Sequence, residues 1–140
     1  MHIVFAANAR ADQPWAADTT ADIAKQTGAS VAVVSVDEVE TSHLEPAPRS
    51  MYVELADQAA SAAVDRLKAA GVSATKTVLS GPALNCIKEF AQEQKADLIV
   101  VGSSTRTPVT ERLIGSVPLS LIKESPVPVV VVTNPDRNQG

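Results

Sequence analysis

The chain contains few cysteine, histidine and aromatic residues, and each of these shortages excludes a kind of structure or site. Its 140 residues include one cysteine, Cys86, so an intrachain disulfide is excluded. No cationic residue adjoins Cys86 in the sequence, so it is expected to be a buried structural residue. His2 and His43 stand far apart with no cysteine cluster, which is not the pattern of a metal site. Aromatic residues make up 3% of the chain, so the core must be built from aliphatic side chains.

The chain also lacks a basic cluster and a long hydrophobic run. Its net charge of −4 argues against nucleic acid or an anionic membrane surface as the main partner. Purely apolar stretches such as Val129 to Val132 are far too short to span a bilayer. The first residues, MHIVFAANARAD, lack the basic segment and apolar length of a signal peptide. We therefore expect a cytoplasmic protein.

What the sequence does contain is a regular alternation of β-branched apolar runs and amphipathic stretches. The apolar runs predict strands at 2–7, 30–36, 72–79, 97–101 and 127–133. The amphipathic stretches predict four helices between them: one ending near residue 26, one over 51–69, one opening at Ser80-Gly81-Pro82, and a short one after Ser116.

Residues with capping preferences mark the expected ends of these helices. Asp12 is expected as the N-cap of the first helix, with Pro14 in its first turn and Gly28 just past its end. Ser50 and Ser116 are expected as the N-caps of the second and last helices.

This alternation predicts one α/β domain with an open parallel five-stranded sheet and helices on both faces, in a Rossmann-like arrangement. The first and fourth strands are the most apolar and belong at the centre, and the more polar third strand belongs nearer an edge, which gives the order 3-2-1-4-5. We assign the domain to residues 1–135 and a flexible C-terminal tail to 136–140. A ligand is expected where the order reverses, beside the loops at 8–13 and 102–116.

The segment over residues 100–118, VVGSSTRTPVTERLIGSVP, is the best candidate to hold an anion. Gly102 follows a buried strand, and Gly115-Ser116 precedes a helix whose unpaired N–H groups favour negative charge. Arg106 and Arg112 lie in the connection, within reach of a phosphate. The same spacing also fits a simpler interpretation, in which the glycines only make turns and Ser116 is only an N-cap.

Four segments together resemble the universal stress protein family: IVFAAN, VAVVSV, VLSGPALNCIKEFAQEQKADLIVVGS and LIGSVPLSLIKESPVPVVVV. The resemblance covers nearly the whole chain. It implies the same 3-2-1-4-5 sheet, a role in stress physiology and, commonly, a dimer.

The nucleotide-binding branch of this family carries Gly-x2-Gly-x9-Gly-Ser/Thr. This chain has Gly102, Thr105, Gly115 and Ser116 at those spacings, so a threonine replaces the second glycine. If the bound loop needs a positive φ there, a β-branched residue costs ~1–2 kcal/mol. A hydroxyl near the phosphates would offset part of that cost.

Two further positions match the family's nucleotide site. Asn8 stands where the family often has an aspartate after strand 1, so a charge-assisted hydrogen bond is lost. Val36 matches a residue that packs on adenine, although an ordinary apolar residue at a strand end fits equally well. The resemblance implies binding of ATP, with Mg²⁺, or of a related adenine nucleotide at Ala6, Asn8, Val36, Gly102, Thr105, Arg106, Gly115, Ser116 and Val117.

Two other functions remain open on the sequence. A nucleotide-free protein of the same fold could act through protein partners, as the changes at Asn8 and Thr105 would allow. A slow ATPase is the third hypothesis, with Glu111 as the nearest acid in the loop. The chain has no Walker GK[ST] and no GxSxG motif, and it lacks the acids of a response-regulator receiver.

The last predicted strand suggests self-association. Val129, Val130, Val131 and Val132 form an apolar strand at a sheet edge, followed by a short polar tail. An uncovered edge invites another strand, and the simplest closed solution is a twofold pairing with a second copy. The alternative is a monomer in which Pro126 and Pro128 blunt the edge.

Overall fold

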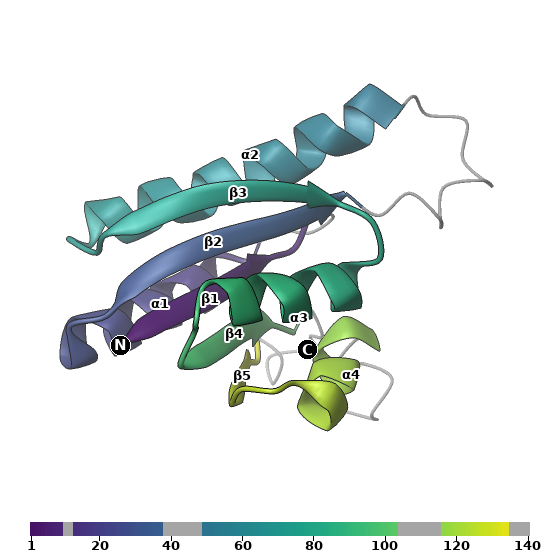
Figure 1. The fold of residues 1–140 in the computed structure, drawn as a ribbon. Helices are drawn as coiled ribbons and strands as arrows, with labels where there is room; N and C mark the ends of the chain where they lie inside the picture. Colours follow the sequence, from purple (N-terminus) through teal and green to yellow (C-terminus); the bar gives the residue numbers. More distant parts are fainter. Residues whose placement is uncertain (10–12, 38–48, 104–115, 135–140) are drawn as a thin grey trace.

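The apolar runs form parallel strands and the amphipathic stretches form the helices that connect them (Figure 1). The structure, a computed structural model, describes residues 1–9, 13–37, 49–103 and 116–134. The tail that we assigned to 136–140 lies outside these residues. The elements in chain order are β1 His2–Ala7, α1 Pro14–Thr27, β2 Ser30–Asp37, α2 Arg49–Ala69, β3 Ala74–Ser80, α3 Ala83–Glu93, β4 Leu98–Gly102, α4 Ser116–Glu124 and β5 Val129–Val132.

The five strands form one sheet in the order β3-β2-β1-β4-β5, as the sequence predicts. All four pairings are parallel. In the centre, Ile3 of β1 pairs with Val31 of β2 on one side and with Leu98 of β4 on the other. The α/β class and the central placement of the two most apolar strands are therefore confirmed.

Helices cover both faces of this sheet. Figure 1 shows α1 and α2 on one side and α3 and α4 on the other. Successive residues of β1 supply the two layers: Ile3 and Phe5 pack with α1 and α2, whereas Val4 and Ala6 pack with α3 and α4. Because both faces are buried, the central strands are apolar at nearly every position.

The start of α1 differs from the prediction. The helix begins at Pro14, so Gln13 occupies the N-cap position, without a side-chain capping bond. Asp12, the predicted cap, lies outside the described residues. The prediction failed because Pro14 takes the first helical position itself, where its missing N–H costs nothing. At the other end, Gly28 has φ 71° and its N–H donates to the Ala24 carbonyl, as expected of a left-handed cap.

The other predicted helix starts are also displaced by a residue or more. The α2 helix begins at Arg49 and α4 at Ser116, so Ser50 and Ser116 occupy helical positions instead of the N-cap position. Ser80 is the last residue of β3, and Pro82 takes the N-cap position of α3. Shifts of this size are common, because a capping residue type is also acceptable within the first turn.

The last strand is shorter than the predicted 127–133, and its own sequence explains why. Pro128 has no N–H to give to a ladder, although its carbonyl accepts from Ile99 N at 2.9 Å. Just before it, Val127 N bonds the Ser125 hydroxyl at 3.1 Å in a local turn. Regular pairing with β4 therefore begins only at Val129.

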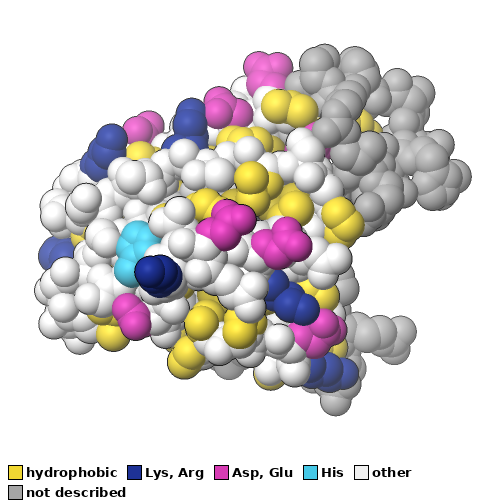
Figure 2. Space-filling model, in the orientation of Figure 1, with side chains coloured by type: hydrophobic (Ala, Val, Ile, Leu, Met, Phe, Trp, Pro, Cys, Tyr) yellow, Lys and Arg dark blue, Asp and Glu magenta, His cyan; other side chains and the backbone are white. Residues whose placement is uncertain are grey.

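Ion pairs tie the helices to their neighbours on the surface. Arg66 of α2 donates from Nε and Nη2 to the two carboxylate oxygens of Asp18 of α1, at 2.6 and 3.2 Å. Lys88 of α3 reaches Glu124 of α4 at 3.2 Å. Figure 2 shows acidic and basic side chains mixed across one face, with hydrophobic atoms between them. Exposed pairs of this kind contribute roughly 0–1 kcal/mol each, so the aliphatic layers dominate stability.

Among the helices that the structure describes, none has the combination of length and apolar content that crossing a bilayer would require.

Candidate functional site

A cavity lies at the carboxyl edge of the sheet, where β1, β2 and β4 end. This is the place where the strand order reverses, between β1 and β4. The cavity measures about 140 Å³. An engineered cavity of roughly 150 Å³ in another protein holds benzene, so this one has room for an aromatic ring.

The wall on the α3 and α4 side is apolar. It is formed by side chains from the ends of β2 and β4 and from the first turns of the two helices: Val34, Val36, Ala83, Ile87, Val101 and Val117. Most of these residues also belong to the buried layer under α3 and α4, so the core holds them in place. The wall is therefore suited to a flat apolar group.

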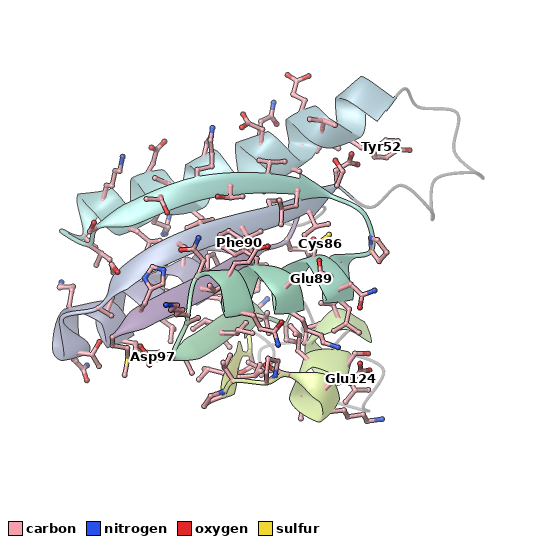
Figure 3. The ribbon with its side chains drawn as sticks, in the orientation of Figure 1. Tyr52, Cys86, Glu89, Phe90, Asp97 and Glu124 are labelled. Carbon is pink, nitrogen blue, oxygen red and sulfur yellow. The ribbon has the colours of Figure 1, made fainter. Side chains whose placement is uncertain are left out.

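Polar groups line the rim on the α1 and α2 side. Asn8 follows β1, Gln13 precedes α1, Asp37 ends β2, and Tyr52 lies in the first turns of α2. Figure 3 shows Tyr52 beyond the carboxyl end of β3, below the start of α2. One side of the cavity can thus hold an apolar group while the other forms hydrogen bonds.

Gly102 ends β4 under the side chain of Gln13. A Cβ atom at Gly102 would lie 2.6 Å from Gln13 Oε1 and 3.0 Å from Ala16 Cβ. The glycine is therefore favoured by the close approach of α1 to β4, and not by a positive φ. Gln13 is 7% exposed, so its amide is packed at the switch point, the place between β1 and β4 where the strand order reverses.

Asp37 is the one charged side chain among the described residues of the cavity wall. It is 2% exposed, and the Ser80 hydroxyl donates to its Oδ2 at 3.3 Å. The predicted strand ends at residue 36, whereas β2 continues through Asp37 and pairs it with Ser80. Its position directly after Val36 was the signal that could have identified it.

The structure brings five of the predicted site residues together in the cavity wall: Ala6, Asn8, Val36, Gly102 and Val117. Ser116 is the first residue of α4, next to Val117. The remaining predicted residues lie outside the described part of the chain: Thr105, Arg106 and Gly115, together with Glu111 and Arg112 of the same connection. A role in binding stays a prediction for all of them.

The weaker candidates lie elsewhere. His2 is at the amino edge of the sheet, where its ring bridges Ser30 Oγ at 2.7 Å and Gln94 Oε1 at 2.9 Å. Cys86 is half-buried in α3, not fully buried as expected, and its thiol lies 3.7 Å from the Ser80 carbonyl. Within the described ranges, no group of three histidine, cysteine or acidic side chains could hold a metal ion.

Comparison with known proteins identifies the family. The model of the universal stress protein family matches residues 1–133. The universal stress protein MJ0531 of Methanocaldococcus jannaschii is 34% identical over 128 residues, which cover 87% of this chain and 75% of the relative.

Solved structures share the fold. The universal stress protein from Archaeoglobus fulgidus in complex with dAMP is 22% identical, with a TM-score of 0.73 over 94% of this chain and 97% of that one. A universal stress protein in complex with cAMP is 23% identical, with a TM-score of 0.69 over 92% of this chain and 95% of that one. With its 3-2-1-4-5 sheet, its switch-point cavity and a family match over residues 1–133, the chain belongs to the universal stress protein family.

Proposed function

We propose that this protein binds an adenine nucleotide in the cavity at the carboxyl edge of β1, β2 and β4, and that it acts as a regulatory protein. The observation that carries the proposal is the cavity itself, which has an apolar wall on one side and hydrogen-bonding side chains on the other. The structural neighbours bound to dAMP and cAMP support adenine nucleotides as the ligand class.

The base would lie against the apolar wall, where Val36, Ile87 and Val117 present aliphatic surface. The phosphates would lie toward Gly102 and the start of α4. The amino end of a helix favours an anion because its first N–H groups are unpaired and its dipole is positive there. Thr105, Arg106, Gly115 and Ser116 would complete this phosphate end, as the family motif implies.

More specifically, we propose that the nucleotide is ATP and that it binds together with Mg²⁺. Mg²⁺ in nucleotide sites is held by the phosphates, by water and by one or two carboxylates. In the described part of the cavity wall the only carboxylate is Asp37, on β2, away from the start of α4. The ion would therefore be carried in mainly by the phosphates. Slow hydrolysis of ATP, with a role for Glu111, and a cytoplasmic location both stay predictions.

We propose further that two copies pair through β5. This strand is an edge of the sheet, as predicted, and its valines are only half-buried within the chain. Its hydrogen bonds are satisfied toward β4, where the Val132 carbonyl accepts from Ser103 N at 2.8 Å. The opposite side of the strand is the template for a second chain.

A cavity-filling substitution tests the nucleotide proposal. In Val117→Trp, a large side chain enters the apolar wall from α4, and we expect ATP, ADP and AMP to bind at least tenfold more weakly, which is ~1.4 kcal/mol. Ile122→Trp is the matched control, because Ile122 is on the same helix and 54% exposed. Titration calorimetry measures both variants against the unmodified chain.

Equal affinities in the two tryptophan variants would place any bound nucleotide outside this cavity. Absence of heat with all three nucleotides at millimolar concentration, in the unmodified chain, would refute nucleotide binding. It would favour the alternative function through protein partners.

A further inference from the structure

A second cavity lies between α1 and α2, on the face of the sheet opposite to α3 and α4. It measures about 400 Å³, within the range of roughly 300–1,000 Å³ that is typical of small-molecule sites. The cavity at the switch point is smaller, at about 140 Å³. The two share wall residues at the end of β1, such as Ala7 and Asn8, but they extend into different core layers. We call the second cavity the α1–α2 groove, and the proposed nucleotide function does not involve it.

The floor and sides of the α1–α2 groove are mainly apolar. Phe5 of β1 lies in the floor, Ala17 contributes from α1, and Ala59 and Ala63 contribute from α2. Phe5, Ala17 and Ala63 also belong to the buried layer under these helices, so the core holds this surface in place. A cavity of roughly 150 Å³ holds benzene, so the groove has room for an alkyl chain or for two fused aromatic rings.

Arg66 gives the groove a positive charge. It is the one ionisable side chain among the described residues of the wall, which include no aspartate or glutamate. The amides of Asn8, Gln13 and Gln58 make up the rest of the polar lining, and each amide carries N–H donors. A guanidinium matches the geometry of a carboxylate, so the groove favours an anionic group and opposes a cationic one.

The carboxylate of Asp18, which is not part of the groove wall, already contacts this guanidinium. The side chains of Arg66 and Asp18 are 51% and 56% exposed, so water screens the pair and it contributes little to stability. An apolar ligand in the groove would exclude water around its own carboxylate and so strengthen its attraction to Arg66. Such a ligand can therefore displace Asp18 or bind beside it.

We propose that the α1–α2 groove binds an apolar carboxylate, with its hydrocarbon part on the floor of the groove and its carboxylate on Arg66. Burial of the hydrocarbon supplies most of the affinity, and the guanidinium determines the orientation. An alkyl chain and a fused aromatic ring system both meet this description, and the test distinguishes them.

The competing explanation is that the groove is only a gap between two helices, which the pair of Arg66 and Asp18 holds together. Arg66→Gln and Asp18→Asn both break this pair, so a purely structural role predicts the same effect for both. A carboxylate site predicts weaker binding in the first variant and no loss in the second. The reason is that Arg66→Gln removes the partner of the ligand, whereas Asp18→Asn removes its competitor.

Titration calorimetry with octanoate, 2-naphthoate and octylamine tests the proposal. The proteins are the unmodified chain, Arg66→Gln, Asp18→Asn, Ala59→Trp and two controls. Ala69→Trp places the same ring at an exposed position at the end of α2, outside the groove wall. Val117→Trp fills the switch-point cavity instead. Thermal unfolding shows that each variant is folded at the temperature of the titrations.

We expect the unmodified chain to bind octanoate or 2-naphthoate, and to bind octylamine at least tenfold more weakly than the tighter acid. Binding of one acid alone identifies an alkyl chain or a ring system as the better fit. Arg66→Gln should weaken the acid about tenfold, whereas Asp18→Asn should bind it as tightly or up to about fivefold more tightly. Ala59→Trp should weaken binding at least tenfold, and the two controls should leave it unchanged.

Absence of heat with both acids at millimolar concentration would overturn the proposal, as would octylamine binding as tight as that of the acids. The same result in Arg66→Gln and Asp18→Asn would show that the carboxylate does not meet Arg66. Unchanged binding in Ala59→Trp, or a loss in Val117→Trp, would place the acid outside the groove. None of these results decides nucleotide binding, which titration of the same proteins with AMP measures separately.

Discussion

Individual contacts at the switch point decide which residues the site tolerates. Gly102 shows this most clearly, because the side chain of Gln13 and the start of α1 occupy the space that any larger residue would need. The first glycine of the family's motif has a packing role here in addition to any contact with phosphate. A ligand that enters the cavity would therefore contact the packed residues Gly102 and Gln13.

We therefore expect Gly102→Ala to destabilise the protein. Its Cβ would lie 2.6 Å from Gln13 Oε1, so the amide or α1 must move. Overpacking of this kind costs ~1–3 kcal/mol, which denaturant unfolding measures. The double variant Gly102→Ala, Gln13→Ala should recover part of that loss, because the clashing side chain is shortened. If the single variant were as stable as the unmodified chain, the close approach of Gln13 would not constrain this position.

The sequence pointed to residues that line the apolar wall of the cavity and missed two that line its polar rim, while a role of any of them in binding stays a prediction. Val36 and Val117 were identified because apolar side chains at strand and helix ends follow from periodicity and from the family motif. Asp37 was missed because an aspartate after an apolar run is typical of a loop. Gln13 was missed because a glutamine in a turn gives no signal of burial.

At the scale of elements, the alternation of strands and helices was predicted correctly and the ends were not. Strand order follows from composition, since the most apolar strands must be central. The exact ends of helices and strands depend on single local features, such as Pro14 at the first position of α1 or the turn at Ser125 before β5. Several neighbouring residues are equally acceptable at such an end, so residue preferences cannot choose between them.

The edge strand β5 gives a prediction at this scale. The carbonyls of Pro128 and Val132 bond to β4, so the even-numbered positions face β4 and the main-chain groups of Val131 point away from it. Val131→Pro removes an outward N–H and breaks no hydrogen bond to β4, and an edge strand tolerates proline at such a position. We expect the variant to be monomeric by light scattering at concentrations where the unmodified chain is dimeric.

Circular dichroism should show that the Val131→Pro variant keeps its helices and strands. A Lys76→Pro change in β3, the opposite edge, is the matched control and should leave self-association unaltered. Ser73 O and Gly81 N bond to β2, so the odd-numbered positions of β3 face β2 and the N–H of Lys76 points outward. A Val131→Pro variant that remained dimeric would show that the two copies pair through a surface other than β5. An unmodified chain that is monomeric at high concentration would refute the proposed pairing.

At the scale of the whole molecule, two aliphatic layers hold the sheet in place, and the order of its strands determines where the cavity lies. The layer under α1 and α2 and the layer under α3 and α4 both include residues of β1 and β4, so the switch point is held from both faces. Loops at this edge can vary without disturbing the layers. This separation explains why fold and family follow from the sequence, whereas the ligand must be measured.

Thermal unfolding over a series of ATP concentrations, with and without Mg²⁺, tests the central claim most directly. A ligand that binds only the folded protein raises the free energy of unfolding by RT ln(1 + [L]/Kd), which is about 2.7 kcal/mol at 100 Kd. We predict a rise of the midpoint that depends on dose in the unmodified chain and is lost in Val117→Trp. An unchanged midpoint at millimolar ATP, ADP and AMP would contradict the nucleotide site.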